Sequence, residues 1–460
     1  MSNDGCTVGD TGDNGGNTSV GGDNGEGGKD KCEEAKAKDD NTAKNAEATI
    51  DSIQKNPSPM SPYCRNKVGE MNKDLDTFNR YRKALPSARA ASAVNKLGNG
   101  NTAIQGDCLT MIVDAKTLND KLDLPSGTIT DEMLRNDKTG FRAAMFKDEA
   151  TGKYILVARD TQPNSLVDWL TNLDNGDGQD TPQYKAMREL TAKLKNNNVS
   201  FDLAGYSKGG GLAQEAGLVN PNSQVYVFNS AGIHKASLSR TPATSFEDLR
   251  NRTFSFSSDG EFLTHMNNTT GSQAQINNAI YLRDQLSGDG SKILGLVSPV
   301  KINYRNPEME EAYLRYKRQE SFYNDYYNDD EYGDDRKGTI RNDIFAPIKP
   351  TNPDPNFERD KASLLNNMDK NINKYRQLAA EGKDFTMMPP VRSGHHETVE
   401  DSRSIAARLV GRGDFDANEL NSTKLIQHQM SAVLDPMEDS VKKNRKKLNA
   451  FNNKCGKLRR

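Results

Sequence analysis

The sequence has no long hydrophobic run, and this absence excludes a membrane-spanning protein. No stretch of about 18 consecutive apolar residues, the length of a transmembrane helix, occurs in the 460 residues. The first residues, MSNDGCTVGDTGDNGG, are polar throughout and contain no apolar core of a secretory signal peptide. We therefore expect a soluble chain without a signal peptide, cytoplasmic in the cell that produces it.

Charge and cysteine spacing exclude two further kinds of site. With 62 Lys and Arg against 64 Asp and Glu, the net charge is −2, so we expect no nucleic-acid partner. The five cysteines are odd in number and scattered, with neither a C-x-x-C pair nor a Cys/His ligand spacing. This pattern argues against a zinc site and leaves disulfides open without supporting any pairing.

Apolar residues are scarce, at 34% of the chain with a mean hydropathy of −0.84, so we expect a core smaller than the length suggests. Changes in composition divide the chain into six regions. These are a disordered Gly/Asn/Asp-rich tail (1–45), a helical N-terminal region (46–139), an α/β core (140–299), a polar Tyr-rich insertion (300–390), a segment that completes the core (391–440) and a basic C-terminal tail (441–460).

Two of these regions have open interpretations. The insertion is too acidic and too rich in tyrosine for a core, so it is interpreted as a cap, a lid or a partner surface. The basic tail is either a solvated terminal helix or a contact with phospholipid head groups.

The core region has the element order of a mostly parallel α/β sheet. Strands are predicted over 141–146 and 154–159, joined by a turn at Thr151-Gly152. A helix over 181–198 and strands over 199–206, 224–229 and 252–257 follow. In such sheets the chemistry lies at the carboxyl ends of the strands.

The stretch FDLAGYSKGGGLAQEAG, residues 201–217, places one serine between a strand and a glycine-rich helix. Ser207 has the frame G-x-S-x-G in the strand-to-helix context of a nucleophile elbow. A serine nucleophile needs a base, an acid that orients the base, and two donors for the oxyanion. In this fold class the chain order is Ser, then Asp or Glu, then His.

The sequence offers an acid and a base in that order. Asp259, in a turn after the strand 252–257, is the predicted acid, with Glu261 as the alternative. The alternative interpretation of Asp259 is a turn residue that only bonds its own backbone. The predicted base is His428, at the start of a last helix from about residue 422, and the alternative is His396, which is predicted to lie in a loop.

The oxyanion donors are predicted from the same geometry. One is the backbone N–H of Lys208, whose side chain would point away from the chemistry, toward solvent or a carboxylate. The other would come from Asp160 or Thr161, after the strand 154–159. We expect no metal and no cofactor. Alternating Asp and Gly over 174–180 leave calcium as an alternative, although a bidentate glutamate downstream is missing.

Residues 140–232 resemble the class 3 lipase-like branch of the α/β-hydrolases, particularly bacterial phospholipases that include type VI secretion effectors. The matching pieces are GFRAAMF, YILVARDT, DWLTNLDNG, AGYSKGGGLA and VYVFNSAGI, with SDGEFLT and HQMSAVLDPME farther on. The resemblance implies an α/β-hydrolase fold with Ser207 as nucleophile, Asp259 as acid, His428 as base and Thr161 near the oxyanion hole.

Three residues depart from the pattern of that family. Asp160 replaces a glycine of the oxyanion loop, Tyr206 stands where histidine is usual, and Lys208 stands where leucine is commoner. The first of these puts the geometry of one oxyanion donor in doubt.

The resemblance implies a phospholipase A-type enzyme whose substrate is a phospholipid membrane. As an effector it would be secreted by a dedicated system, act at the envelope of a target cell, and have an immunity protein and a secretion adaptor as partners. One alternative is a soluble carboxylesterase or thioesterase with the same triad. Another is a degenerate hydrolase fold that acts as a binding protein, which Asp160 favours.

Overall fold

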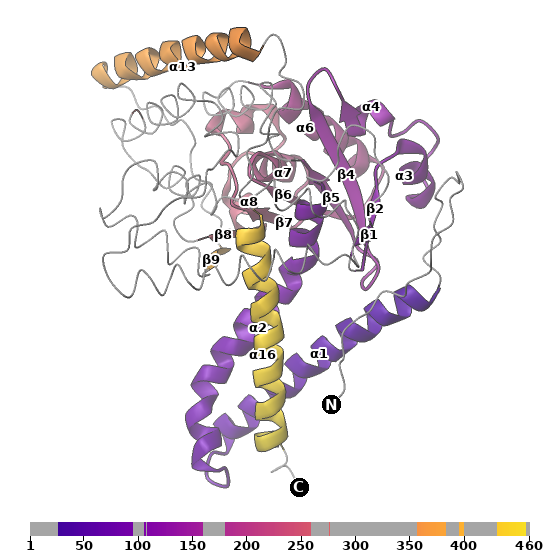
Figure 1. Ribbon diagram of the computed structural model, residues 1–460, viewed down its shortest axis with the longest axis vertical. Coiled ribbons are helices and arrows are strands. Elements are labelled where there is room, and N and C mark those ends of the chain that lie inside the picture. The colour runs from indigo at the N-terminus through magenta and orange to yellow at the C-terminus, as the bar shows by residue number, and fades with distance from the viewer. Residues whose placement is uncertain are drawn as a thin grey trace.

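The computed structural model describes residues 26–94, 105–106, 108–159, 180–258, 276, 357–382, 395–399 and 430–456. Among these residues, nine strands form one mixed sheet (Figure 1). The strands are β1 (Gln105–Gly106), β2 (Leu109–Ile112), β3 (Arg135–Asn136), β4 (Phe141–Asp148), β5 (Tyr154–Ala158), β6 (Phe201–Tyr206), β7 (Val225–Phe228), β8 (Thr253–Ser258) and β9 (His395–Val399). Their order is β1-β2-β4-β5-β6-β7-β8-β9, with β3 paired to β4.

The sheet is antiparallel at one side and parallel from β5 to β9. The described helices are α1 (Glu26–Lys55), α2 (Pro62–Val94), α3 (Ala115–Lys121), α4 (Asp131–Leu134), α6 (Pro182–Asn196), α7 (Lys208–Val219), α8 (Glu247–Arg252), α13 (Phe357–Ala380) and α16 (Ser431–Cys455), with a 3₁₀ helix η1 (Lys235–Arg240). The predicted hairpin, the helix over 181–198 and the parallel strands are all confirmed.

Helices cover both faces of the parallel strands. In β6, Leu203 belongs to the apolar cluster of α6 and α7, whereas Ala204 and Tyr206 belong to the cluster that contains Phe78 of α2. The central strands β6 and β7 are therefore buried on both faces, which explains their nearly continuous apolar sequence. This three-layer arrangement confirms the predicted α/β fold class.

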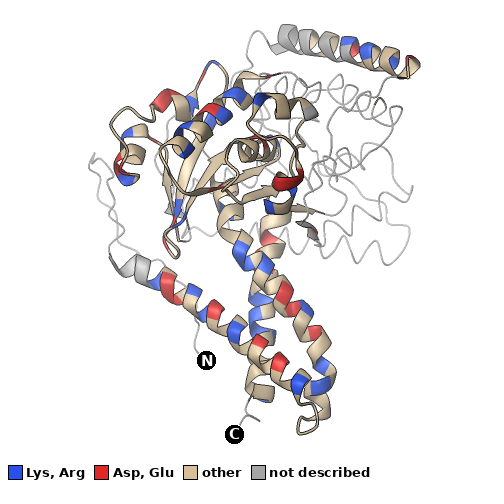
Figure 2. Cartoon of the chain, turned by 180° about the vertical axis from the view of Figure 1, so that it is seen from behind, with Lys and Arg blue, Asp and Glu red and all other residues tan. Residues whose placement is uncertain are grey.

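Helices α1, α2 and α16 pack together in a bundle that extends away from the sheet (Figure 1). Its interior contains the buried side chains of Ala46, Ile50, Phe78, Leu448 and Phe451. Charged residues of both signs alternate along its surface (Figure 2). The bundle therefore joins the N-terminal helices to the last helix of the chain.

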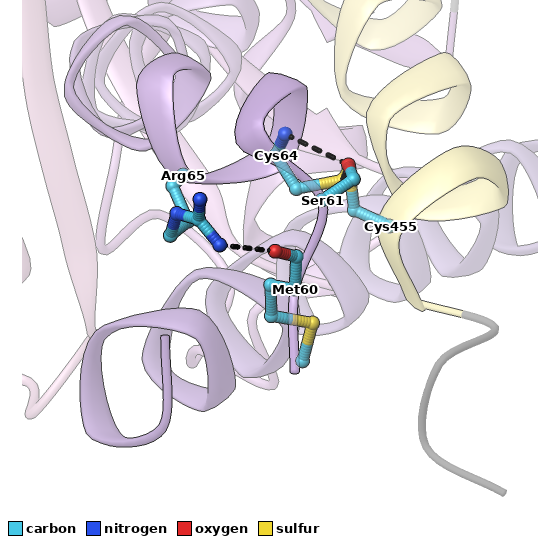
Figure 3. The surroundings of a disulfide bond; sticks show 5 residues. All are labelled: Met60, Ser61, Cys64, Arg65 and Cys455. Carbon is cyan, nitrogen blue, oxygen red and sulfur yellow. Dashed lines mark hydrogen bonds between the residues drawn. A yellow bond between two sulfur atoms is a disulfide. The ribbon is translucent and has the colours of Figure 1, made fainter. Parts of the chain in front are cut away.

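Ion pairs and two disulfides join segments that are far apart in the sequence. Across the bundle, Lys447 Nζ lies 2.9 Å from Asp74 Oδ2. Cys64, near the start of α2, is bonded to Cys455 at the end of α16 (Figure 3). Near the sheet, Cys32 of α1 is bonded to Cys108, which lies between β1 and β2. The sequence left disulfides open, and the structure supplies these two pairs.

Residues 26–45 were predicted to be part of a disordered tail, and this is wrong, because they form the greater part of α1. The apolar side chains of α1 are few, but Ala43, Ala46, Ile50 and Ile53 are buried against the rest of the bundle. The side chains that pack against them come from α2 and α16, and the composition of residues 1–45 alone does not reveal these contacts. Residues 1–25 lie outside the described part.

The prediction of a helical region over 46–139 is incomplete, because β1, β2 and β3 also lie there. These strands have two to four residues each, too few to show a period. The segment expected to complete the core does so in part, since β9 pairs with β8. Of the insertion over 300–390, the described part contains helix α13.

The prediction of a separate basic tail over 441–460 is wrong for the residues up to Cys455, because these residues continue α16. Val441, Leu448, Phe451 and Cys455 are buried on one side of this helix. Helix α16 contains Pro436 and begins at Ser431, whereas the last helix was predicted to begin near residue 422. No helix in the described part of the chain combines the length and the apolarity needed to span a bilayer.

Candidate active site

Ser207 lies at a sharp turn between β6 and α7. Its backbone has φ 53° and ψ −122°, a conformation that a residue with a side chain rarely adopts. The conformation is maintained by neighbours on both sides: Ser207 N donates to Phe228 O at 3.0 Å, and Ser207 O accepts from Ala231 N at 2.9 Å. This strained strand–serine–helix turn is the backbone geometry that a nucleophile elbow requires.

Two glycines allow the elbow to be this tight. A Cβ atom on Gly205 would lie 2.1 Å from the carbonyl oxygen of Gly209, and one on Gly209 would lie 2.4 Å from the carbonyl oxygen of Ala158. The first turn of α7 therefore contacts both its own strand and the end of β5.

The carboxyl ends of β6, β7 and β8 meet at one edge of the sheet. Ser207 follows β6, Asn229 follows β7, and Ser258 ends β8. Hydrogen bonds run across these ends, from Asn229 N to Phe256 O at 2.9 Å and from Ser258 N to Asn229 Oδ1 at 2.9 Å. The chain position of Asp259 directly follows Ser258, although Asp259 itself lies outside the described residues.

His396 is not in a loop, as the sequence suggested, but in strand β9, where its backbone pairs with Ser255. Ser255 is level with Val227, and Val227 with Gly205, so His396 lies three strands from β6. Neighbouring strands are about 4.8 Å apart, which places this backbone about 14 Å from the elbow strand. A base must come within hydrogen-bond reach of the nucleophile, so this placement does not favour His396.

The remaining predicted site residues lie outside the described part of the chain. They are Asp160, Thr161, Asp259, Glu261 and His428. Helix α16 begins three positions after His428 and contacts β8 and β9.

The side chain of Lys208 is 1% exposed, so the expectation that it could point toward solvent is wrong. A buried ammonium group is costly unless an acceptor is close by, which leaves a carboxylate as the other expected alternative. The backbone N–H of Lys208 begins α7, where the helix dipole is positive.

A buried group of charges lies behind the elbow helix. Arg188 of α6 pairs with Glu215 of α7, and Ser237 Oγ donates to Glu215 Oε2 at 2.6 Å. Arg188 Nη2 also lies 2.7 Å from Asp180 Oδ1. These contacts fix α7 against α6 and η1, and the sequence analysis missed them. Arg188 and Glu215 could have been noticed as charges at otherwise apolar helix positions.

No group of three or more His, Cys, Asp or Glu side chains within the described ranges could hold a metal ion. Asp180, the last residue of the segment that left calcium open, pairs with Arg188. The other residues of that segment are outside the described part.

A hollow of about 490 Å³ lies on the α2 face of the sheet, away from the elbow. Its walls include Tyr226, Phe254 and Phe256, and an ion pair between Arg80 Nε and Glu397 Oε2 of 2.7 Å lies at one side. Ser207 does not line this hollow, so it is not a pocket at the elbow.

Residues 104–297 match the family model of the Tle-like phospholipase domain, which is described as phospholipase-like. No curated protein matches the chain. The matched range includes the strands β1 to β8 and the elbow, and omits α1, α2 and α16. The resemblance to bacterial phospholipase effectors predicted from the sequence is confirmed over this range, and the functional class that it supports is a lipolytic hydrolase.

Proposed function

We propose that this protein is a serine phospholipase of the A type, which hydrolyses acyl esters of membrane phospholipids. The observation that carries the proposal is the strained turn at Ser207 inside the range that matches a phospholipase family. Strained backbone at a position with a nucleophilic side chain is typical of active sites.

In the proposed mechanism Ser207 Oγ attacks the ester carbonyl and forms an acyl-enzyme, which water then hydrolyses. His428 takes the proton from Ser207 and gives it to the leaving alcohol, and Asp259 orients the imidazole. The backbone N–H of Lys208 and a donor at Asp160 or Thr161 stabilise the oxyanion.

The described backbone supports these assignments. The contact between Gly209 and the end of β5 favours an oxyanion donor from the residues after Arg159. The last hydrogen-bonded residue of β8, Ser258, precedes Asp259 directly. The position of His396 three strands from β6 leaves His428, three positions before α16, as the proposed base.

The two disulfides support action outside the cytoplasm, because disulfides persist in oxidising compartments. We infer delivery by a dedicated secretion system to the envelope of a target cell, with an immunity protein and a secretion adaptor as partners. The reaction as proposed requires no cofactor.

One observation favours the alternative of a soluble carboxylesterase or thioesterase. In the described part of the chain, Tyr63 is the one large hydrophobic side chain that is exposed, so no apolar surface for membrane contact is present there. Phospholipid specificity therefore depends on the family match.

The test is fatty-acid release from mixed phosphatidylethanolamine and phosphatidylglycerol vesicles, measured by mass spectrometry for wild type and Ser207→Ala. Ser239→Ala, which removes an exposed hydroxyl elsewhere, is the matched control. We expect release by wild type and the control, and none by Ser207→Ala.

Release of short-chain p-nitrophenyl esters without release from vesicles would favour the soluble esterase. If the folded wild type hydrolysed neither the vesicles nor the short-chain esters, the result would favour a binding protein. Toxicity of the wild type in the periplasm but not in the cytoplasm of a host cell would support the proposed site of action, and toxicity of Ser207→Ala would contradict an enzymatic cause.

A further inference from the structure

Asn229 has a backbone conformation and a side-chain role that the mechanism above does not use. It follows β7, its side chain is fully buried, and its φ is 41°. Asparagine tolerates positive φ better than most residues, but glycine would satisfy this requirement alone. The side chain therefore needs a separate explanation.

The explanation lies in the ladder between β7 and β8. Asn229 N donates to Phe256 O, as in a regular parallel pair. The next bond of a regular ladder would run from Ser258 N to the backbone carbonyl of Asn229. Instead, Ser258 N donates to Asn229 Oδ1 at 2.9 Å, and Asn229 Nδ2 lies 3.5 Å from Ser258 Oγ. The side-chain oxygen of Asn229 thus takes the place of its backbone carbonyl as the acceptor of this bond.

The same residue is linked to the elbow. Phe228, immediately before Asn229, accepts the N–H of Ser207. A short series of hydrogen bonds therefore connects the nucleophile, the end of β7 and the last residue of β8, at the edge where Asp259 follows in sequence.

We propose that Asn229 is a positioning residue that fixes the point at which the acid-bearing segment leaves β8. The inference rests on the proposed function, since it assigns Asn229 a role through Asp259. Without the side-chain carbonyl, Ser258 N–H loses its bond to Asn229, and the chain position directly before Asp259 is less firmly held.

The decisive variants are Asn229→Gly and Asn229→Asp. Glycine accepts the positive φ and removes the side-chain bond, so the acid supports the base less well and the base loses its proton at lower pH. Aspartate keeps an acceptor for Ser258 N–H but adds a negative charge beside the residue that precedes the proposed acid. In the proposed mechanism this added charge favours the protonated base, which then loses its proton at higher pH. The two substitutions therefore shift the acidic limb of the pH–rate profile in opposite directions.

Asn220→Gly is the matched control. Asn220 is also buried, and its side chain also makes two hydrogen bonds, with Ser223 Oγ at 2.9 Å and Asn222 N at 3.2 Å. It follows α7 and lies toward the start of β6, because Ser223 Oγ donates to Phe201 O. Its loss lowers stability without a reason to alter the protonation of the base.

The experiment measures kcat, KM and the pH profile from 5 to 9 for the full chain, with phosphatidylglycerol in mixed micelles as substrate. For Asn229→Gly we expect kcat to fall at least about tenfold, less than the ~10⁴-fold effect of a nonfunctional triad acid, with little change in KM. The acidic limb of the pH–rate profile should shift to lower pH in Asn229→Gly and to higher pH in Asn229→Asp. In Asn220→Gly it should stay at the pH of the wild type.

A folded Asn229→Gly with wild-type kcat would overturn the inference, as would a loss of activity with neither limb displaced. If Asn229→Gly does not fold, the direction of the shift in Asn229→Asp decides. Ser207→Ala is measured alongside: activity remaining in that variant would refute the proposed function itself, whereas its loss with unshifted Asn229 profiles would refute the positioning role alone.

Discussion

At the scale of single residues, the elbow depends on Ser207 and also on the absence of a side chain at Gly205 and Gly209. Ser207 can keep its strained backbone because β6, α7 and the end of β5 approach one another within contact distance. Any side chain at this crossing would have to displace main-chain atoms, which have little freedom to move.

Gly209→Ala should therefore destabilise the fold and abolish ester hydrolysis. The new methyl group would lie 2.4 Å from the carbonyl oxygen of Ala158, and overpacking of this kind typically costs about 1–3 kcal/mol or more. Urea unfolding followed by circular dichroism measures the loss.

Gly69→Ala gives the matched control for that substitution. Gly69 is an exposed position inside α2 with nothing within 4 Å of the added Cβ. Here alanine should stabilise the protein by about 0.5–1 kcal/mol, because it favours the helical state. If both substitutions changed the free energy of unfolding in the same way, the close contact at Gly209 would not be what excludes a side chain there.

At the scale of elements, the strands and helices of the core could be predicted from the sequence and the outer elements could not. Strands β4 to β7 are largely apolar, β8 places phenylalanine between polar residues, and α6 has helical spacing, so local information was sufficient. Helix α1 is polar over most of its length, and its small apolar side is buried only because α2 and α16 pack on it. Helix α16, which supplies part of this packing, is hundreds of residues away in the sequence.

The pairing of β6 with the start of β7 contains a pH-sensitive contact. Asp202 of β6 accepts a hydrogen bond from Gln224 N at 3.0 Å, just before β7 begins. Burial raises the pKa of the Asp202 carboxyl above its ordinary value of 3.8, although this hydrogen bond and Lys153 act in the opposite direction. The folded state therefore binds a proton more tightly than the unfolded state does.

Asp202→Asn should stabilise the protein at pH 7. A carboxyl with a raised pKa favours the folded state below its unfolded pKa, and this contribution is lost as pH rises through the folded pKa. Asparagine keeps an oxygen that accepts from Gln224 N and never becomes charged. The difference in Tm between variant and wild type should be largest at neutral pH, decrease as pH falls through the raised pKa, and disappear below the ordinary value of 3.8.

Thermal unfolding at several pH values between 3 and 8 measures this difference. A variant that is less stable than wild type at pH 7 would show that the attraction of Asp202 to Lys153 and Lys83 outweighs the cost of burying its charge.

At the scale of the whole molecule, the site combines local and distant information. The serine could be predicted because its motif, strand and helix are contiguous. The roles of Asn229, Arg188 and Glu215 could not, because each depends on which strand or helix lies next to it. His396 was placed in a loop for the same reason, since β9 becomes a strand by pairing with β8 across more than a hundred residues.

The bundle packs the N-terminal helices α1 and α2 against the last helix, α16, and the Cys64–Cys455 disulfide links α2 to α16. In the chain-entropy model, a crosslink stabilises by restricting the unfolded chain, and more so for a longer loop. The loop between Cys64 and Cys455 spans 391 residues, compared with 76 between Cys32 and Cys108. The first disulfide should therefore contribute more, by about 1.4 kcal/mol in that model.

The double variants Cys64→Ser/Cys455→Ser and Cys32→Ser/Cys108→Ser test this order. Each double variant should lower the free energy of unfolding by about 2–5 kcal/mol, and the variant without the Cys64–Cys455 disulfide should lose more. A reductant should lower the Tm of the wild type. It should have no further effect on a protein that lacks both disulfides. Thiol titration of the unfolded chain gives the control, because two disulfides leave one free thiol of five cysteines. Five free thiols in protein from an oxidising compartment would contradict the crosslinks, and with them the support that the disulfides give to the proposed action outside the cytoplasm.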